Sequence, residues 1–303
     1  MKSVLLVNLG TPSAPTPAAV RSYLAEFLSD PRVVPLPRPL WLPLLHGVVL
    51  PLRAPQSAHK YAQIWMPEGS PLAVYTARMA ALLAERLERP VRYAMRYGAP
   101  AIASALSDLA DPFVVPLYPQ YAASTTGSVL DVLPPGTPAV RGFHDHPAYI
   151  AALAASVRRH WQERGRGLML LMSFHGLPQR MAGDYERECR TTAALLAQAV
   201  GLRDAEWRVT FQSRFGYARW LEPYTEQTLI ELAREGLRRA DVICPGFVAD
   251  CLETLEEIGI RARTRFRDAG GDELELVPCL NDAPEWIAAL AALVTGPSAR
   301  ASP

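Results

Sequence analysis

The chain has 303 residues, a formal net charge of +1 at pH 7, and hydrophobic residues at 50% of its positions. This length provides enough apolar material for one or two globular domains. The mixed charge and high apolar content exclude disorder as the main state. A near-neutral balance also argues against a nucleic-acid partner, because such proteins need a basic face.

No targeting or membrane-spanning segment is evident. Residues 1–3 lead directly into the apolar run 4–7, without the charged region, long apolar region and cleavage site of a signal peptide. The longest apolar stretch, residues 39–52, is too short for a bilayer span and is interrupted by prolines. Four cysteines are far apart and form no Cys-x-x-Cys pair, which favours reduced thiols. We therefore expect a soluble, cytoplasmic protein.

Short apolar runs alternate with amphipathic stretches along the chain. This alternation predicts an α/β fold with parallel sheets covered on both faces. The expected strands are residues 3–8, 91–95, 113–118, 167–173, 208–212, 241–244 and 273–277. Helices are expected at residues 18–28, 73–87, 148–162, 185–200 and 222–238, among others.

The chain has two halves that begin alike, each with an aliphatic run followed by a turn rich in Gly and Pro. We expect an N-terminal domain over residues 1–145 and a C-terminal domain over residues 146–303, both doubly wound. Ligands of such sheets bind at the carboxyl ends of the strands. Candidate catalytic residues are therefore sought in the loops at that edge.

One histidine stands at such a position. His175 follows the apolar run 168–174, so its imidazole is expected at the carboxyl edge of a buried strand. An imidazole can exchange a proton near neutral pH and can bind a metal. The alternative is a structural histidine that hydrogen-bonds a backbone carbonyl, and the residue alone does not decide between them.

An acidic pattern follows the strand at 241–244. At about 100° per residue of helix, Asp250, Glu253 and Glu257 fall within roughly 60° of one another. Three carboxylates on one ridge could pass a hard divalent cation or carry protons. The alternative is a solvated acidic face, which is common on helices.

Other features are weaker. Residues 124–128 (STTGS) could hold an anion at the start of a helix, and the alternative is that they only cap that helix. Arg96 and Tyr97 end an expected strand, and Trp220 could line a pocket or belong to the core. The sequence has no P-loop, dinucleotide fingerprint, zinc-protease motif or esterase elbow.

Taken together, these segments closely resemble the ferrochelatase family. The resemblance covers nearly the whole chain in the expected order, and its most specific parts are the histidine motif and the acidic motif. The matching segments are residues 7–12 (VNLGTP), 118–121 (YPQY), 124–128 (STTGS), 173–178 (SFHGLP), 211–214 (FQSR), 220–223 (WLEP) and 245–255 (PGFVADCLETL).

The resemblance implies two Rossmann-like domains with a porphyrin cleft between them. It also implies that the chain is a lyase that inserts Fe²⁺ into protoporphyrin IX to form protohaem and releases two protons. His175 and Glu253 match the pair credited with metal binding and proton abstraction, and Asp250 and Glu257 match the acidic ridge beside them. The positions that resemble porphyrin contacts are Leu9, Arg53, Tyr61, Ser70 and Trp220.

Two positions depart from many relatives. Position 251 is Cys where many have His, so one proton acceptor is missing beside the acidic ridge. The C-terminus lacks the cysteine-bearing extension that holds an iron–sulfur cluster in some members, so none is expected. No permanently bound cofactor is implied, because the reaction needs no redox change and Fe²⁺ is a substrate.

Two alternatives remain for the function. The substrate could be coproporphyrin III, although Leu9 stands where relatives using that porphyrin tend to carry Tyr. A non-catalytic haem or porphyrin carrier is the other alternative. A monomer is the favoured oligomeric state.

Residues 37–50 are strongly apolar without a helical stripe, so we expect them to form one lip of the cleft and to contact membranes weakly.

Overall fold

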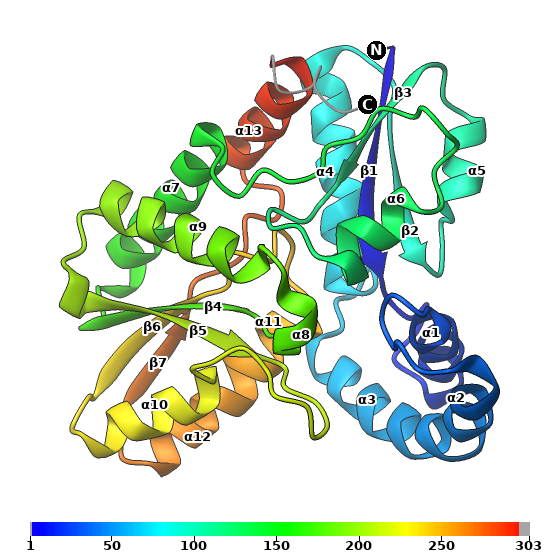
Figure 1. The fold of residues 1–303 in the computed structure, drawn as a ribbon. Coiled ribbons are helices and arrows are strands. Elements are labelled where there is room, and N and C mark those ends of the chain that lie inside the picture. The colour runs from blue at the N-terminus through cyan, green and yellow to red at the C-terminus, as the bar shows by residue number, and fades with distance from the viewer. Residues whose placement is uncertain (1, 297–303) are drawn as a thin grey trace. The chain divides into compact units, whose positions relative to one another are not determined.

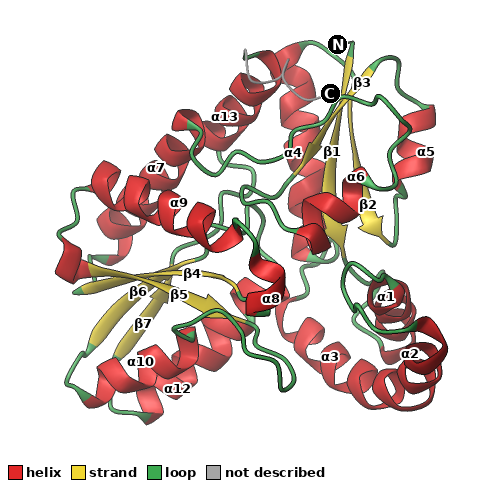
Figure 2. Cartoon of the chain, viewed as in Figure 1, coloured by secondary structure: helices red, strands yellow, loops and turns green. Residues whose placement is uncertain are grey.

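The computed structural model describes residues 2–296, and these form two compact units. The first unit comprises residues 2–117, 123–141 and 294–296, and the second comprises residues 118–122 and 142–293. Each unit is an α/β structure around its own sheet, and both sheets are entirely parallel (Figure 2).

The first unit has a three-stranded sheet in the order β2-β1-β3. Strand β1 is central because its apolar residues, Val4 to Val7, are fully buried between two neighbours. The elements are β1 (Ser3–Gly10), α1 (Pro17–Ser29), α2 (Arg38–Leu44), a π-helical turn η1 (Leu45–Val49), α3 (Leu50–Ile64), α4 (Pro71–Leu87), β2 (Val91–Tyr97), α5 (Ile102–Ser107), β3 (Pro112–Pro116), a π-helical turn η2 (Ala123–Gly127) and α6 (Ser128–Leu130).

The second unit has a four-stranded sheet in the order β5-β4-β6-β7. Helices α7 and α9 lie on one face of this sheet and α10 and α12 on the other (Figure 1). The elements are α7 (Pro147–Arg164), β4 (Met169–His175), α8 (Gln179–Ala182), α9 (Tyr185–Val200), a 3₁₀ turn η3 (Asp204–Glu206), β5 (Trp207–Gln212), α10 (Thr225–Arg234), β6 (Arg239–Ile243), α11 (Leu252–Leu255), a π-helical segment η4 (Glu257–Ala262), α12 (Arg263–Asp268), β7 (Glu273–Leu276) and α13 (Pro284–Thr295).

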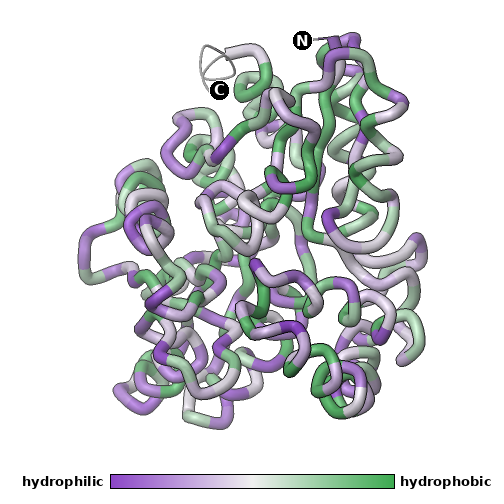
Figure 3. Tube along the Cα trace, turned by 45° about the vertical axis from the view of Figure 1, so that its right-hand side comes forward, coloured by the Kyte–Doolittle hydropathy of each residue, from purple (hydrophilic) through white to green (hydrophobic). Residues whose placement is uncertain are grey.

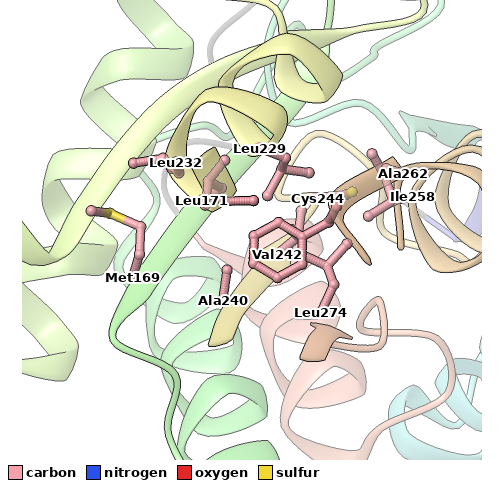
Figure 4. Close-up of a cluster of buried hydrophobic side chains, with 12 residues drawn as sticks. Met169, Leu171, Leu229, Leu232, Ala240, Val242, Cys244, Ile258, Ala262 and Leu274 are labelled. Atoms are coloured by element: carbon pink, nitrogen blue, oxygen red, sulfur yellow. The ribbon is translucent and has the colours of Figure 1, made fainter. Parts of the chain in front are cut away.

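The core of the second unit explains why the sheet strands are apolar. Leu171 on β4 and Val242 on β6 are fully buried, and they pack with Leu229 of α10 and Phe266 of α12 (Figure 4). Both faces of a parallel sheet are covered by helices, so the strands carry continuous apolar runs. The same packing places the carboxyl ends of β4, β5 and β6 together at one edge.

Every expected strand is present, and the prediction of parallel α/β sheets is confirmed. The expected helix at 222–238 is shorter, since α10 covers only Thr225–Arg234. Purple and green stretches alternate along the trace in Figure 3, and no described helix is long and apolar enough to cross a membrane.

The expectation that residues 37–50 lack a helical stripe is wrong. The segment forms α2 and η1 and continues into α3. Proline is tolerated in the first turn of a helix, where the missing N–H has no partner to lose; Pro39 and Pro51 both occupy such positions. The exposed apolar side chains recur at every fourth position, namely Leu36, Leu40, Leu44, Val48 and Leu52. We call these five residues the leucine stripe.

Candidate active site

His175 is the last residue of β4, and one hydrogen bond defines its tautomer. Its ring Nδ1 lies 2.6 Å from the carbonyl oxygen of Gly176. A carbonyl only accepts, so Nδ1 carries the proton and Nε2 keeps its lone pair. The Tyr185 hydroxyl donates to the His175 carbonyl at 2.9 Å and fixes the backbone below the ring. The half-buried imidazole is thereby presented with Nε2 as a base or metal ligand.

Gly176 is required by a close backbone approach. Its N–H donates to the carbonyl oxygen of Gln212 at 2.8 Å. A Cβ at position 176 would lie 2.8 Å from that same oxygen and 3.2 Å from Cε3 of Trp220. Only glycine lets the turn after His175 pack so closely against the end of β5.

Gln212 connects the histidine strand to the acidic segment. It is buried and pairs with His175 in the register of β4 and β5. Its Oε1 accepts from the Ser173 hydroxyl at 2.7 Å. Its Nε2 donates to the backbone carbonyl of Glu253 at 2.7 Å and approaches Oε2 of Glu257 at 3.5 Å. The structure therefore brings His175, Glu253 and Glu257 to one edge of the sheet through a single amide.

In the sequence, Gln212 stands out only as part of the segment 211–214 (FQSR), which does not indicate this role. The feature of the sequence that indicates the role of Gln212 is instead a side-chain amide at the end of a buried strand. Such a group is costly to bury without partners, so its partners identify the segments that meet there.

The three acidic residues do not form one ridge on a continuous α-helix, as the spacing predicted. Helix α11 begins only at Leu252, with Cys251 as its N-cap, and the backbone becomes π-helical from Glu257. Position 250 therefore precedes the helix, and Glu257 follows a change of helical period. A constant 100° per residue does not hold across such a segment.

Asp250 is a buried structural residue rather than an exposed acid. Its carboxylate is buried and accepts from the Thr254 hydroxyl at 2.9 Å and from the Asn281 amide at 2.7 Å. The Thr254 oxygen in turn accepts the N–H of Cys251 at 3.0 Å. These bonds fix the start of α11 and leave Asp250 no free face.

Glu253 lies in the first turn of α11 and is half-buried. The neighbouring Cys251 caps this helix, and its side chain accepts the backbone N–H of Thr254. Burial, together with the negative charge of Glu253, raises the pKa of the Cys251 thiol well above its usual range, so the thiol stays protonated.

The predicted porphyrin-contact residues fall into two groups. Leu9 on β1, Arg53 and Tyr61 on α3, and Ser70 before α4 all belong to the first unit. The Ser70 hydroxyl accepts from the Thr11 hydroxyl at 2.7 Å, which ties the end of β1 to the start of α4. Tyr61 is buried, and Arg53 and Leu9 are half-buried.

Trp220 belongs to the second unit, beside Gly176. Its indole Nε1 is buried without a hydrogen-bond partner among the described residues. The backbone next to it is bound to the turn after the histidine, since Leu221 N–H donates to the Leu177 carbonyl at 2.9 Å. Trp220 is thus held close to the His175 turn.

The weaker sequence features converge on a buried carboxylate in the first unit. Asp30 accepts from the Arg96 guanidinium at 2.7 Å, from the Tyr97 hydroxyl at 2.9 Å and from the Ser128 hydroxyl at 3.1 Å. Arg96 also donates to the Ser128 carbonyl at 2.9 Å. Arg96 is therefore not a surface residue, and Ser128 serves this internal network.

Within residues 2–296, no set of three or more His, Cys, Asp or Glu side chains is grouped so as to hold a metal ion. His175 can offer a nitrogen and Glu253 an oxygen to a cation that arrives as a substrate.

Comparison with known proteins identifies the family. The family model described as Ferrochelatase matches residues 1–297. A ferrochelatase from Azoarcus sp. (strain BH72) is 57% identical over 308 residues, covering 95% of this chain and 85% of the relative. A ferrochelatase from Bordetella pertussis is 52% identical over 313 residues, covering 96% of this chain and 86% of the relative.

Solved chelatase structures share the fold. CbiX, described as the terminal enzyme of sirohaem biosynthesis in denitrifying bacteria, superposes with a TM-score of 0.51 at 17% identity, covering 96% of this chain and 97% of CbiX. SirB from Bacillus subtilis with Fe³⁺ gives a TM-score of 0.52 at 14% identity, covering 97% and 94% of the two chains. With the family model and relatives above 50% identity along almost its whole length, this chain belongs to the ferrochelatase family of metal-chelating enzymes.

Proposed function

We propose that this ferrochelatase inserts Fe²⁺ into protoporphyrin IX, forming protohaem and releasing two protons, as the last step of haem biosynthesis. The observation that carries the proposal is the hydrogen-bonded edge of the second sheet. There His175 bonds the Gly176 carbonyl through Nδ1, which leaves Nε2 available, and Gln212 fixes the segment bearing Glu253 beside the end of the histidine strand.

The residues match what the reaction demands. The porphyrin loses two pyrrole protons as the metal enters, and the metal sheds water. His175 Nε2 takes a proton, because Nδ1 is already committed to the Gly176 carbonyl and Nε2 is the ring nitrogen left with a lone pair. Glu253 relays protons or offers a transient oxygen to the incoming cation.

Leu9 favours protoporphyrin over coproporphyrin as the substrate. Protoporphyrin IX carries vinyl groups where coproporphyrin III carries two further propionates. Leu9 lies half-buried at the carboxyl end of β1 and offers no hydrogen bond to a carboxylate. An apolar contact of this kind suits a vinyl group better than a propionate.

Anaerobic incubation with Fe²⁺ and each porphyrin tests the proposal, with the Soret and visible bands as the readout. We expect kcat/KM to be highest for protoporphyrin IX. A preference for coproporphyrin III would reassign the substrate. Binding of porphyrin without metal insertion would favour a non-catalytic carrier.

The catalytic role of the histidine has its own test. His175→Ala should abolish metal insertion while porphyrin still binds, because the macrocycle is held mainly by apolar contacts. Porphyrin binding is followed by quenching of tryptophan fluorescence without metal. Turnover by the variant comparable to that of the parent protein would remove His175 from the mechanism.

We also propose that the leucine stripe contacts porphyrin and the surface of anionic membranes. Its five side chains are exposed, at 74% for Leu40 and 62% for Leu52. Residues 31–64 contain no Asp or Glu, and their basic residues are Arg32, Arg38, Arg53 and Lys60. An apolar stripe within a purely basic segment fits a helix that lies in a membrane interface.

A further inference from the structure

The carboxylate of Glu257 is surrounded by donors. Its Oε1 accepts from the backbone N–H of Ser213 at 2.8 Å and lies 3.2 Å from the Arg261 guanidinium. Its Oε2 accepts from the Ser213 hydroxyl at 2.6 Å. With the approach of Gln212 at 3.5 Å, both oxygens are engaged by the protein itself. A cation or a proton would have to displace these partners.

Arg261 makes this position unfavourable for a metal ion. The guanidinium also contacts Glu226 at 2.8 Å and Glu256 at 3.9 Å, so it is held among three carboxylates. Its positive charge therefore stays next to Glu257. A divalent cation bound to that carboxylate would meet a like charge a few ångströms away.

Ser213 begins the loop of residues 213–220, and its backbone needs support. Its φ is +64°, in the left-handed region, which is strained for a residue other than glycine. Both of its donors converge on the same carboxylate and compensate for this cost. The loop then runs through the exposed Phe215 and Tyr217 to Trp220.

The far end of the loop is attached to the histidine turn. Gln179 N–H donates to the Arg219 carbonyl and Leu221 N–H donates to the Leu177 carbonyl, both at 2.9 Å. The loop is thus anchored by Glu257 at its start and by the turn after His175 at its end.

We propose that Glu257 is a positioning residue that tethers the 213–220 loop, and so places Trp220 for porphyrin binding, rather than a station on a metal or proton path. The tether consists of contacts within the protein and needs no substrate, whereas its effect on porphyrin binding rests on the proposed function. Arg261 completes the tether by holding the Glu257 carboxylate toward Ser213.

Limited trypsin digestion tests the tether without any substrate. Glu257→Gln should increase cleavage after Arg214 and Arg219 by at least about fivefold, because a charged acceptor of two hydrogen bonds is lost. Mass spectrometry identifies the cleaved bonds. Glu226→Gln is the matched control, since it removes a different carboxylate partner of Arg261 but leaves the bonds to Ser213 intact. Unchanged cleavage in Glu257→Gln would overturn the tether.

Steady-state kinetics separate the two roles of the carboxylate. For Glu257→Gln we expect the KM for porphyrin to rise about fivefold, in line with the loosened loop, and the KM for Fe²⁺ to stay constant. Arg261→Gln should behave in the same way. A metal path predicts the opposite pattern, in which Glu257→Gln raises the KM for Fe²⁺ and Arg261→Gln lowers it.

Ser213→Gly keeps the proposal testable if a charge variant folds poorly. Glycine accepts the positive φ and retains the N–H donor, so only the hydroxyl bond is lost. We expect a smaller change in the same direction in both assays. If the protein inserts no metal into any porphyrin, the proposed function fails while the digestion still decides the tether.

Discussion

The turn after His175 depends on one missing side chain. Gly176 has an ordinary negative φ, so its importance comes from space and not from backbone conformation. The Gln212 carbonyl and the Trp220 ring fill the volume that a methyl group would need. This contact sets the distance between the histidine and the strand whose amide fixes Glu253.

Gly176→Ala should therefore destabilise the protein by about 1–3 kcal/mol, because the new methyl group overlaps backbone that cannot move freely. Activity should fall as well, since the turn shifts. Urea unfolding and the chelation assay measure both effects. Gly246→Ala is the control for stability, because its Cβ would meet atoms only at 3.4 and 3.5 Å. Equal stability of the two variants would contradict the crowding argument.

Asp30 gives the first unit a pH-dependent contribution to stability. Burial acts to raise the pKa of this carboxyl group, but hydrogen bonds from Arg32, Tyr97 and Ser128 and the charge of Arg96 outweigh it, so the pKa is lowered. A lowered folded-state pKa stabilises the fold above the unfolded value, and the contribution is lost as pH falls through the folded value.

Asp30→Asn should cost about 2 kcal/mol at pH 7, because Arg96 loses its charged acceptor. The difference from the parent protein should shrink as the pH falls below about 4, the ordinary pKa of an aspartate. Urea unfolding across this range measures it. Asp131→Asn is the control: its ion pair with Arg32 is exposed, and its loss should cost less than about 1 kcal/mol. A pH-independent difference for Asp30→Asn would refute the linkage.

The sequence predicted some residues of the candidate site and not others. His175 and Glu253 stand out because a motif and a strand end mark them. Gln212 and Ser213 are ordinary residue types, and their roles depend on partners more than 30 residues away in the chain. Local patterns contain no information on such partners.

At the level of elements, the acidic segment shows how capping can override helical spacing. Asp250 has the spacing of a ridge residue, but its bonds to Thr254 and Asn281 hold it outside the helix. Short polar side chains at a helix start commonly bond nearby backbone and side chains in this manner. The π-helical segment that follows then turns Glu257 toward Ser213.

Glu253→Gln should consequently reduce kcat far more than Glu257→Gln. Glu253 is the carboxylate that the proposed mechanism uses, and its loss should cost at least about 100-fold, as expected for a general acid–base group. Glu257→Gln should act on the KM for porphyrin. Rapid mixing with saturating Fe²⁺ and porphyrin measures kcat directly. Equal, small losses of kcat would remove Glu253 from the proposed mechanism.

The helices that the sequence failed to indicate share a cause. In α2 and α3 the prolines lie where breaks are expected, yet two of them occupy first turns. The intervening π-helical turn changes the period, so no 3.6-residue pattern spans the segment. The strands were easier, because a buried parallel strand needs only a short apolar run between turns.

At the scale of the whole molecule, the alternation of strands and helices determined the α/β class and the parallel sheets. It did not determine the strand orders β2-β1-β3 and β5-β4-β6-β7, because these depend on which strands meet across intervening helices. The leucine stripe likewise could not be identified from the sequence, because the solvent exposure of its five side chains depends on the fold. The composition of the segment does not indicate which of its apolar residues are exposed.

Trp41 is not suited to testing the stripe. It is half-buried, and its indole Nε1 donates to the Leu28 carbonyl at 2.7 Å, so it anchors α2 against the end of α1. Replacing it would disturb the fold and obscure any effect at the surface. Leu40 and Leu52 are the most exposed members of the leucine stripe, so their replacement should disturb the packing little.

The double variant Leu40→Ser and Leu52→Ser should bind anionic vesicles about thirtyfold more weakly, because the two inserted leucines together contribute on the order of 2 kcal/mol. Binding of the parent protein should also weaken as salt screens the basic residues of the segment. Co-sedimentation with vesicles measures both, and circular dichroism checks folding. Leu168→Ser is the control, since this leucine is 73% exposed but belongs to the second unit. Equal vesicle binding by all three proteins would contradict membrane contact, and loss of a dimer in light scattering would assign the stripe to a second copy of the chain.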